Sequence, residues 1–384
     1  MEIYFDNSAT TKCYESVKDV MVQALLCDYG NPSAMHRKGF EAEQLLKKAR
    51  ERFANILRGK AGEIFFTSGG TESNNLAILG AARANRRKGN KLITTSIEHP
   101  SVMMVMEQLE QEGFEIVKIP VDRYGILDWE RLVKEVDQQT ILVSVMQVNN
   151  EIGAVEPIEK IGRYLKQEAP ASLFHVDAIQ SFGKMRIAPK QMGVDLLSIS
   201  GHKIHGPKGI GVLYVREGVR LLPVLYGGGQ QMGLRSGTEN VPGIVGMAKA
   251  AEEIYERIDE IERNLYELKD YFVDQVGKLP DVIVNGKTGR ESAPHIVSVS
   301  FLGVRSEVLL HALEEKGIYV SAGSACSSHK SSKSPTLQAI GAKKEQLDST
   351  LRFSFCAENT KEEIEKTMET LKELLPFLRK FQRR

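Results

Sequence analysis

A lysine in a glycine-rich turn offers the chemistry of a buried amine. Lys203 lies in the segment 200–209, SGHKIHGPKG, between two short apolar runs at 194–199 and 210–215. Such runs are typical of buried strands, so we expect Lys203 to be interior. An interior lysine must pair its ammonium group or lose its proton, and a neutral amine is a nucleophile for Schiff-base formation. On its own, the residue is explained equally well by a structural ion pair or a solvent-facing loop.

An acid lies 26 residues before this lysine. Asp177 follows the apolar run 173–176, and ligands of open α/β sheets bind at the carboxyl ends of strands. A carboxylate there can keep a proton on a heterocyclic nitrogen, or it can simply cap the following segment. Combined with a Schiff-base lysine, it fits pyridoxal phosphate (PLP), whose protonated ring accepts electrons.

A candidate phosphate site lies in residues 65–74, FFTSGGTESN, which pass from a strand through a glycine turn into a helix. The free N–H groups and the dipole of the helix favour an anion there, and the Thr71 hydroxyl adds a donor. Many connections of this kind bind no ligand. We therefore expect a phosphate site only together with Ser200 and His202, which flank the lysine turn.

Two further polar residues follow apolar runs. His99 is usually expected to be structural or exposed at such a turn, but its ring could instead lie over a planar cofactor and move protons. Asn150 could contact a cofactor oxygen or cap a turn.

The elements around these residues alternate between strands and helices from about residue 60 to 215. This alternation predicts an α/β fold with a mostly parallel sheet covered by helices on both faces. Expected strands are 63–67, 91–95, 115–119, 141–147, 173–176, 196–199 and 211–215, and expected helices include 72–87 and 158–167.

A second region begins after residue 243. Apolar residues from Ile254 to Val276 recur at spacings of three and four, which predicts one long helix joining two domains, with a coiled-coil stripe as the alternative. We expect strands at 282–284, 296–301 and 351–355, a helix around 308–316, and a closing helix capped by Thr360 and Glu363. The predicted domains are a large one, 14–255, and a smaller α+β one formed by 1–13 and 256–384.

Composition excludes several classes of protein. The 384 residues are 42% apolar, which is enough to fill the cores of two domains. A net charge of +1 gives no field to attract nucleic acid or an anionic membrane. No apolar run could span a bilayer or serve as a signal core, so we expect a cytoplasmic protein without membrane or direct nucleic-acid partners. The cysteines lack Cys-x-x-Cys spacing, so neither structural zinc nor a disulfide is expected.

One cysteine differs from the others in its surroundings. Cys326 lies in the segment 321–335, SAGSACSSHKSSKSP, whose small polar residues cannot fill a core and predict a mobile loop. His329 and Lys330 could favour its thiolate. The remaining cysteines are expected to be buried and inert: Cys13, Cys27 and Cys356.

Taken in order, these residues resemble the pattern of NifS- and IscS-like cysteine desulfurases, PLP enzymes of fold type I in the class V aminotransferase group. The resemblance extends over nearly the whole chain. The matching segments are 4–11, 30–33, His99, Asn150, 177–180, 200–203, 235–240 and 352–354.

The resemblance implies a seven-stranded sheet and a role in cofactor binding for each matching residue. Lys203 would form the Schiff base, and Asp177 would pair with the pyridine nitrogen. His99 would stack on the ring and transfer protons, while Asn150 and Gln180 would contact ring substituents. The residues expected to bind the phosphate are Gly70, Thr71, Ser200 and His202, together with Thr238 from the neighbouring subunit of a homodimer.

The resemblance also implies a substrate pocket. The planar fork of Arg352 suits bidentate capture of an amino acid carboxylate, although strand arginines more often face solvent or pair with a local acid. Asn31, His36 and Asn150 could line the same pocket.

The implied activity is the removal of sulfur from L-cysteine, giving L-alanine and a persulfide on Cys326. A protein acceptor would then take the sulfur for iron–sulfur cluster assembly or for tRNA or cofactor thiolation. The alternatives are another class V reaction, transamination or selenocysteine lysis, and a non-catalytic scaffold with the same fold. Relatives often have a glycine soon after this cysteine, whereas 327–333 has none, which leaves the acceptor open.

Overall fold

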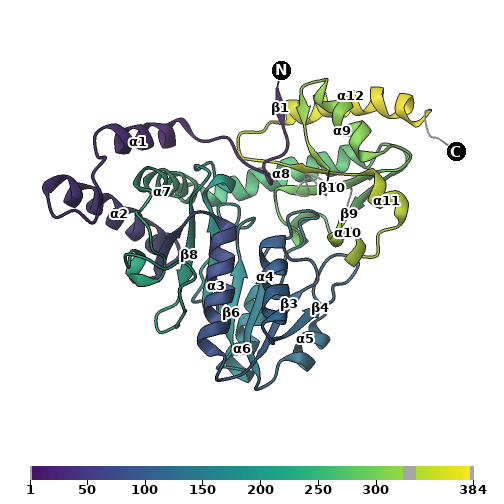
Figure 1. Cartoon of the computed structure of the whole chain (residues 1–384). Coiled ribbons are helices and arrows are strands. Elements are labelled where there is room, and N and C mark those ends of the chain that lie inside the picture. Colours follow the sequence, from purple (N-terminus) through teal and green to yellow (C-terminus); the bar gives the residue numbers. More distant parts are fainter. Residues whose placement is uncertain (1, 323–333, 381–384) are drawn as a thin grey trace.

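The computed structural model describes residues 2–322 and 334–380 (Figure 1). Cys326 and most of the predicted loop 321–335 therefore lie outside the described residues.

A seven-stranded sheet forms the centre of the larger body (Figure 1). Its order is β2-β8-β7-β6-β5-β3-β4, and only β8 runs against the others, so the predicted mostly parallel sheet is confirmed. Each predicted strand agrees with the observed one to within one residue at either end. The strands are β2 (Ile64–Thr67), β3 (Lys91–Thr95), β4 (Glu115–Ile119), β5 (Thr140–Met146), β6 (Leu173–Asp177), β7 (Leu196–Ser200) and β8 (Gly211–Val215).

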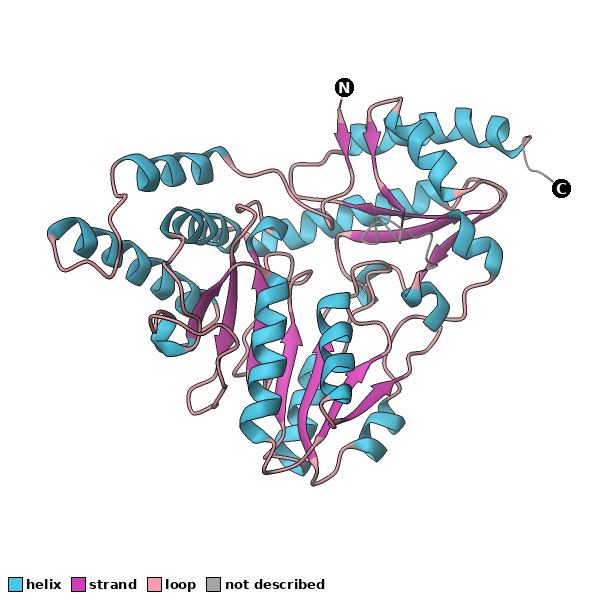
Figure 2. Ribbon diagram, in the orientation of Figure 1, coloured by secondary structure: helices cyan, strands magenta, loops and turns pink. Residues whose placement is uncertain are grey.

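Helices cover both faces of this sheet (Figure 2). Successive residues of a strand point to opposite faces, so Leu92 and Leu142 pack with α3 and α4, while Ile93 and Val143 pack with the helices of the other face. This double burial explains why the strands read as continuous apolar runs. The helices of this body are α1 (Glu15–Leu26), α2 (Arg37–Ile56), α3 (Gly70–Asn85), α4 (Pro100–Gln111), α5 (Trp129–Glu135), α6 (Ile158–Glu168) and α7 (Val241–Glu256).

A smaller antiparallel sheet lies beside the first body, in the order β12-β13-β10-β9. Its strands are β9 (Val282–Asn285), β10 (Ile296–Phe301), β12 (Ser321–Ala322) and β13 (Thr350–Ser354). The N-terminal strand β1 (Ile3–Tyr4) joins this side of the molecule by pairing with β11 (Ile318–Tyr319). The helices here are α8 (Ile258–Val276), α9 (Ser306–Glu314), α10 (Pro335–Ala339), α11 (Lys344–Ser349) and α12 (Lys361–Arg379).

The capping box predicted for the closing helix is confirmed. Helix α12 begins with the predicted capping box, in which Thr360 and Glu363 exchange hydrogen bonds. Short 3-10 helices complete the fold at Ala61–Glu63, Gly201–Lys203, Gln231–Gly233 and Gly289–Glu291. None of the helices in the described ranges is long and apolar enough to cross a bilayer.

The prediction of one long helix through Ile254 and Val276 is wrong. Helix α7 ends at Glu256 and α8 begins at Ile258, with Arg257 at φ −124° and ψ 20° between them. Helix α7 packs on α1 and α2, whereas α8 packs on α12 and β10, and the apolar spacing continues across the break because Ile254 and Ile258 are both buried. Periodicity cannot reveal a change of direction that preserves the spacing.

The expectation that three cysteines are buried is correct only for Cys356. Cys13 precedes α1 and Cys27 ends it, and both are exposed. Helix α1 buries only Val17 and Ala24, so residues at its two ends have little to pack against.

Candidate active site

The carboxyl ends of the parallel strands bring most of the predicted site residues to one edge of the large sheet. Gly70 follows β2, His99 follows β3, and Asn150 follows β5, while Asp177 ends β6 and Ser200 ends β7. This edge is where open α/β sheets bind their ligands.

Lys203 lies in the 3-10 helix directly after β7 and is partly buried. Its Nζ donates hydrogen bonds to the carbonyl oxygens of Ser8, at 2.5 Å, and Ala9, at 2.7 Å. These carbonyls belong to the segment between β1 and α1, which also bonds the turn through Thr11 N–H and the His202 carbonyl, at 2.9 Å. The N-terminal segment therefore holds the lysine at the sheet edge.

Asp177 is a buried acid, with 4% of its surface exposed. Its Oδ1 accepts from Ile179 N–H at 2.9 Å, and its Oδ2 accepts from the Asn74 amide at 2.8 Å. Burial raises the pKa of Asp177, while these hydrogen bonds, His99 and Lys203 act in the opposite direction. A protonated pyridine nitrogen would supply the positive charge that a buried carboxylate requires, so this residue fits PLP.

His99 caps the N-terminus of α4. Its Nδ1 accepts from Ser101 N–H at 3.1 Å and lies 2.8 Å from Ser101 Oγ. Because Nδ1 accepts a backbone hydrogen bond, the neutral ring has its proton on Nε2. Burial lowers the pKa of His99, with Asp177 raising it and Lys203 lowering it further. A neutral ring with Nε2–H can donate a proton from Nε2 while Nδ1 keeps the cap, so the capping and functional interpretations are compatible.

The two halves of the predicted phosphate site lie together. A Cβ built on Gly70 would come within 2.2 Å of Ile179 Cδ1 and 3.4 Å of Ser200 Cβ, so glycine allows this approach without a shift of the Ile179 side chain. Thr71 is exposed in the first turn of α3, where backbone N–H groups can bind an anion. Burial, together with nearby lysines, lowers the pKa of His202 to about 4, so its ring is neutral. These residues fit a phosphate.

Gln180 and Thr238 occupy different surroundings. Gln180 is buried and donates to the Ser8 carbonyl at 3.0 Å, beside Lys203. Thr238 is exposed in the connection between β8 and α7. The Arg235–Glu72 ion pair, at 2.7 Å, ties that connection to the start of α3. Thr238 is thus near the phosphate side of the sheet but faces outward.

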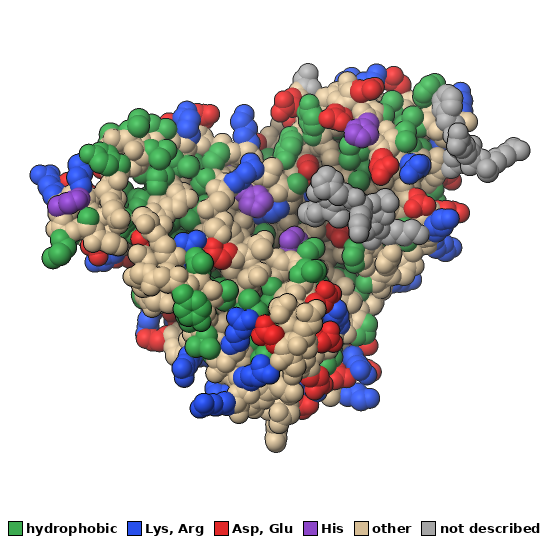
Figure 3. Space-filling model, in the orientation of Figure 1, with side chains coloured by type: hydrophobic (Ala, Val, Ile, Leu, Met, Phe, Trp, Pro, Cys, Tyr) green, Lys and Arg blue, Asp and Glu red, His purple; other side chains and the backbone are tan. Residues whose placement is uncertain are grey.

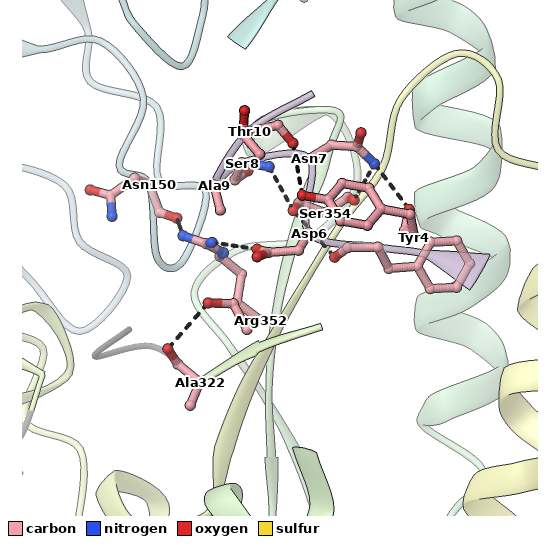
Figure 4. Close-up of polar contacts among 12 residues, drawn as sticks. Tyr4, Asp6, Asn7, Ser8, Ala9, Thr10, Asn150, Ala322, Arg352 and Ser354 are labelled. Atoms are coloured by element: carbon pink, nitrogen blue, oxygen red, sulfur yellow. Dashed lines mark hydrogen bonds and ion pairs between the residues drawn. The ribbon is translucent and has the colours of Figure 1, made fainter. Parts of the chain in front are cut away.

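Arg352 lies on β13 and is buried, with 6% of its surface exposed (Figure 4). Its Nη1 donates to the Asn150 carbonyl at 2.9 Å, and its Nη2 pairs with Asp6 Oδ1 at 2.8 Å. Its Nε has no hydrogen-bond partner among the residues that the structure describes. The guanidinium therefore joins the two sheets at the sheet edge, and it retains N–H groups for an incoming carboxylate.

Asn31 and His36 are not brought to this site in their own chain. They lie in the exposed connection between α1 and α2, at the outer end of the molecule in Figure 1. Their hydrogen bonds are local, with Asn31 accepting from Ser33 N–H and His36 from Gly39 N–H.

The two residues that flank the segment containing Cys326 lie close to Arg352 and Asn150. Ser321 pairs with Arg352 across β12 and β13. Ser334, at the other flank, caps α10 and donates to Glu151, the neighbour of Asn150. The described residues on both sides of the Cys326 segment therefore lie beside Arg352.

Sequence reasoning did not predict three groups that contact the site residues: Asn74 on Asp177, Asp6 on Arg352 and the Ser8 carbonyl on Lys203. One signal was present, because asparagine is a poor residue for a helix interior and Asn74 lies within α3, one turn after Gly70. Nothing local to Asp6 indicated Arg352, which is 346 residues away.

The sequence matches the family described as Aminotransferase class-V over residues 3–367. The chain belongs to the class V aminotransferases. A curated class V relative, cysteine desulfurase IscS of Methanosarcina thermophila, is 42% identical over 98% of this chain and 93% of its own length. Among solved structures, a NifS-like protein is 39% identical with a TM-score of 0.93, covering 98% of this chain and all of that one. A second, SspA in complex with cysteine, is 33% identical with a TM-score of 0.79, covering 94% of this chain and all of that one.

These class V relatives confirm the predicted resemblance to NifS- and IscS-like cysteine desulfurases. The predicted fold type, enzyme class and cofactor are confirmed with it, and the buried Asp177, the Lys203 turn and the glycine approach at Gly70 fit PLP.

Proposed function

We propose that this class V enzyme releases sulfur from L-cysteine and receives it on Cys326. The observation that supports this most directly is the position of the flanks of the Cys326 segment, which lie beside Arg352 and Asn150. A solved relative with cysteine bound agrees with this substrate.

The protein supplies binding and proton transfer. PLP, when bound, acts as the sink for the electrons released from the substrate. Asp177 would keep the pyridine nitrogen protonated, and the first turn of α3 with Ser200 and His202 would hold the phosphate. Arg352 binds the substrate carboxylate through its remaining N–H groups. Lys203 is the amine that would hold the cofactor, and with His99 it would move the proton at the substrate Cα.

Cys326 is the nucleophile of the sulfur transfer. Its thiolate attacks the substrate sulfur, a sulfur–sulfur bond forms, and the carbon–sulfur bond breaks with its electron pair left on the carbon side. Protonation of that fragment yields L-alanine, and a persulfide remains on Cys326.

The test is Cys326→Ser with Cys27→Ser as the matched control, because Cys27 is an exposed cysteine at the end of α1. We expect Cys326→Ser to lose alanine formation and the persulfide detected by mass spectrometry, while retaining bound PLP. Alanine produced at the parental rate without added thiol would show that another group receives the sulfur. A ketoacid product would instead indicate transamination.

We further propose a homodimer that passes sulfur to a protein acceptor, an iron–sulfur scaffold or a thiolation enzyme, in the cytoplasm. Thr238, Asn31 and His36 are exposed in their own chain, as expected if they serve the partner's site. Apolar side chains gather over α1 and α2 at one end of the molecule, which supports an interface there (Figure 3). The exposed apolar residues of this end, hereafter the α1–α2 patch, are Val22, Leu25, Leu26, Tyr29, Met35 and Phe40.

A further inference from the structure

Three potential metal ligands lie together on one side of the Lys203 turn. Ligand atoms of His205, Cys356 and Glu358 are all within 4.8 Å of one another. His205 and Cys356 are buried, whereas the Glu358 side chain is 50% exposed. The cluster therefore has an interior part and an opening to solvent.

The fold assembles this group from distant parts of the chain. His205 follows the 3-10 helix that ends at Lys203, while Cys356 and Glu358 follow β13, the strand of Arg352. The lack of Cys-x-x-Cys spacing predicts no structural zinc site, but a site built across two sheets leaves no such spacing.

The orientation of His205 is that of a metal ligand. Its Nδ1 lies 2.8 Å from the Lys12 carbonyl, which can only accept, so Nδ1 has the ring proton. The Tyr14 ring stacks on the imidazole with centroids 4.3 Å apart and planes 3° from parallel. Metal-binding histidines commonly fix their tautomer by such a bond to a backbone carbonyl. The Nε2 lone pair is left to face the cluster.

The neighbour of that lone pair is a carboxylate. His205 Nε2 and Glu358 Oε2 are 3.5 Å apart, a separation that either a proton on Nε2 or a metal ion held between the two atoms makes attractive. The backbone of His205 is also held at φ 58°, a conformation that residues other than glycine rarely adopt. Strained residues of this kind concentrate at functional sites.

The ligand set is chemically suited to zinc. A thiolate, an imidazole and a carboxylate all bind Zn²⁺ at about 2.0–2.3 Å in a tetrahedron, which places ligand atoms about 3.3–3.8 Å apart. The observed spread of up to 4.8 Å requires a small closure, which the half-exposed Glu358 side chain can provide. Water can occupy the fourth position through the same opening.

Charge in the cluster is compatible with a divalent ion. The ligands contribute two negative charges once the Cys356 thiol releases its proton to solvent. Lys184 is the nearby buried cation, and it donates to the Lys203 carbonyl at 2.8 Å. The bound ion would be neutralised by its own ligands, so Lys184 would not face a net positive charge.

We propose that His205, Cys356 and Glu358 bind one zinc ion, with water as the fourth ligand. The ion joins the turn after Lys203 to the end of β13, and so joins the two sheets that together form the active site. Its role is distinct from the sulfur chemistry.

The test uses the PLP-loaded protein, stripped of metal and titrated with Zn²⁺ against a chromophoric chelator. We expect one tight equivalent per chain, and a rise of a few degrees in Tm on binding. Cys356→Ser and Glu358→Gln should weaken binding by about 10- to 100-fold or more. X-ray absorption should show one sulfur ligand at about 2.3 Å in the parent and none in Cys356→Ser.

Two control variants make the assignment specific. Cys27→Ser and Cys326→Ser should both retain the zinc equivalent, since neither residue belongs to the cluster. Loss of zinc in Cys326→Ser, unchanged binding in Cys356→Ser, or no tight zinc in the parent would each overturn the proposal. Circular dichroism and PLP absorbance establish that each variant is folded, so that weaker zinc binding is read as loss of a ligand.

Discussion

Asn74 donates its side-chain amide to Asp177 Oδ2 at 2.8 Å, in a part of the protein where both side chains are buried. The bond joins α3, whose first turn is the phosphate side of the site, to the carboxyl end of β6. It favours the ionised form of Asp177 against the effect of burial. In the proposed function, Asn74 would therefore affect how readily Asp177 holds a proton on the cofactor nitrogen.

We expect Asn74→Ala to lower kcat/KM by about 10- to 100-fold, because a hydrogen bond to a charged group contributes about 1.5–3 kcal/mol. Its loss would raise the pKa of Asp177 further, and the visible absorbance of bound PLP should change. Asn75→Ala is the matched control, since the Asn75 amide donates to the Thr71 and Ser101 carbonyls. Equal effects of the two substitutions would contradict this role.

Replacing Arg352 by lysine tests carboxylate binding. Lysine keeps the charge but loses the planar fork, so we expect KM for L-cysteine to rise about 10- to 100-fold with PLP content unchanged. Steady-state kinetics of alanine formation measure the effect. The exposed Arg305→Lys should behave as the parent. A fall in kcat at constant KM would instead assign Arg352 to the chemical step.

Glu98 makes stability depend on pH. Burial raises its pKa to about 8, against hydrogen bonds from Thr95 and Met146 N–H, while an unfolded glutamate titrates near about 4.3. Between these values the folded protein holds a proton that the unfolded chain has released, so the free energy of unfolding falls as pH rises.

Glu98→Gln removes this titration. We expect its Tm to exceed that of the parent at about pH 8, with the advantage shrinking toward about pH 5. Thermal unfolding across this range is the measurement, and Glu107→Gln, at an exposed ion pair with Lys118, is the control. A Tm difference that stays constant with pH would rule out the titration of Glu98 as its cause.

The proposed dimer can be separated into monomers at the α1–α2 patch. Phe40→Asp places a charge on a side chain that is 58% exposed, and we expect it to reduce the sedimenting mass from twice 42.8 kDa to 42.8 kDa. PLP should be held less tightly, because Thr238 of the partner would be withdrawn. Val308→Asp, on the exposed face of α9, should remain dimeric. A parent that sediments as a monomer would contradict the proposal.

The strands of the large sheet could be predicted closely because each is a short apolar run ended by turn residues. Burial on both faces enforces that pattern locally, so β3 and β8 were predicted to the residue. The edge strand β4, which is buried only at Ile119, was also predicted to the residue. The break at Arg257 could not be predicted, because α7 and α8 pack on different neighbours, α1 and α2 for α7 and α12 and β10 for α8, yet share one continuous apolar spacing.

The sequence by itself predicted the cofactor, since Lys203, Asp177, His99 and Gly70 each lie at or just after the end of a strand and parallel strands end at the same edge. Tertiary structure alone decided their partners. Asn74 reaches Asp177 across 103 residues, and Asp6 reaches Arg352 across 346. The His205, Cys356 and Glu358 cluster arises in the same way. Such pairs depend on strand order and on how two sheets meet, and these are set by packing of the whole chain rather than by any local spacing.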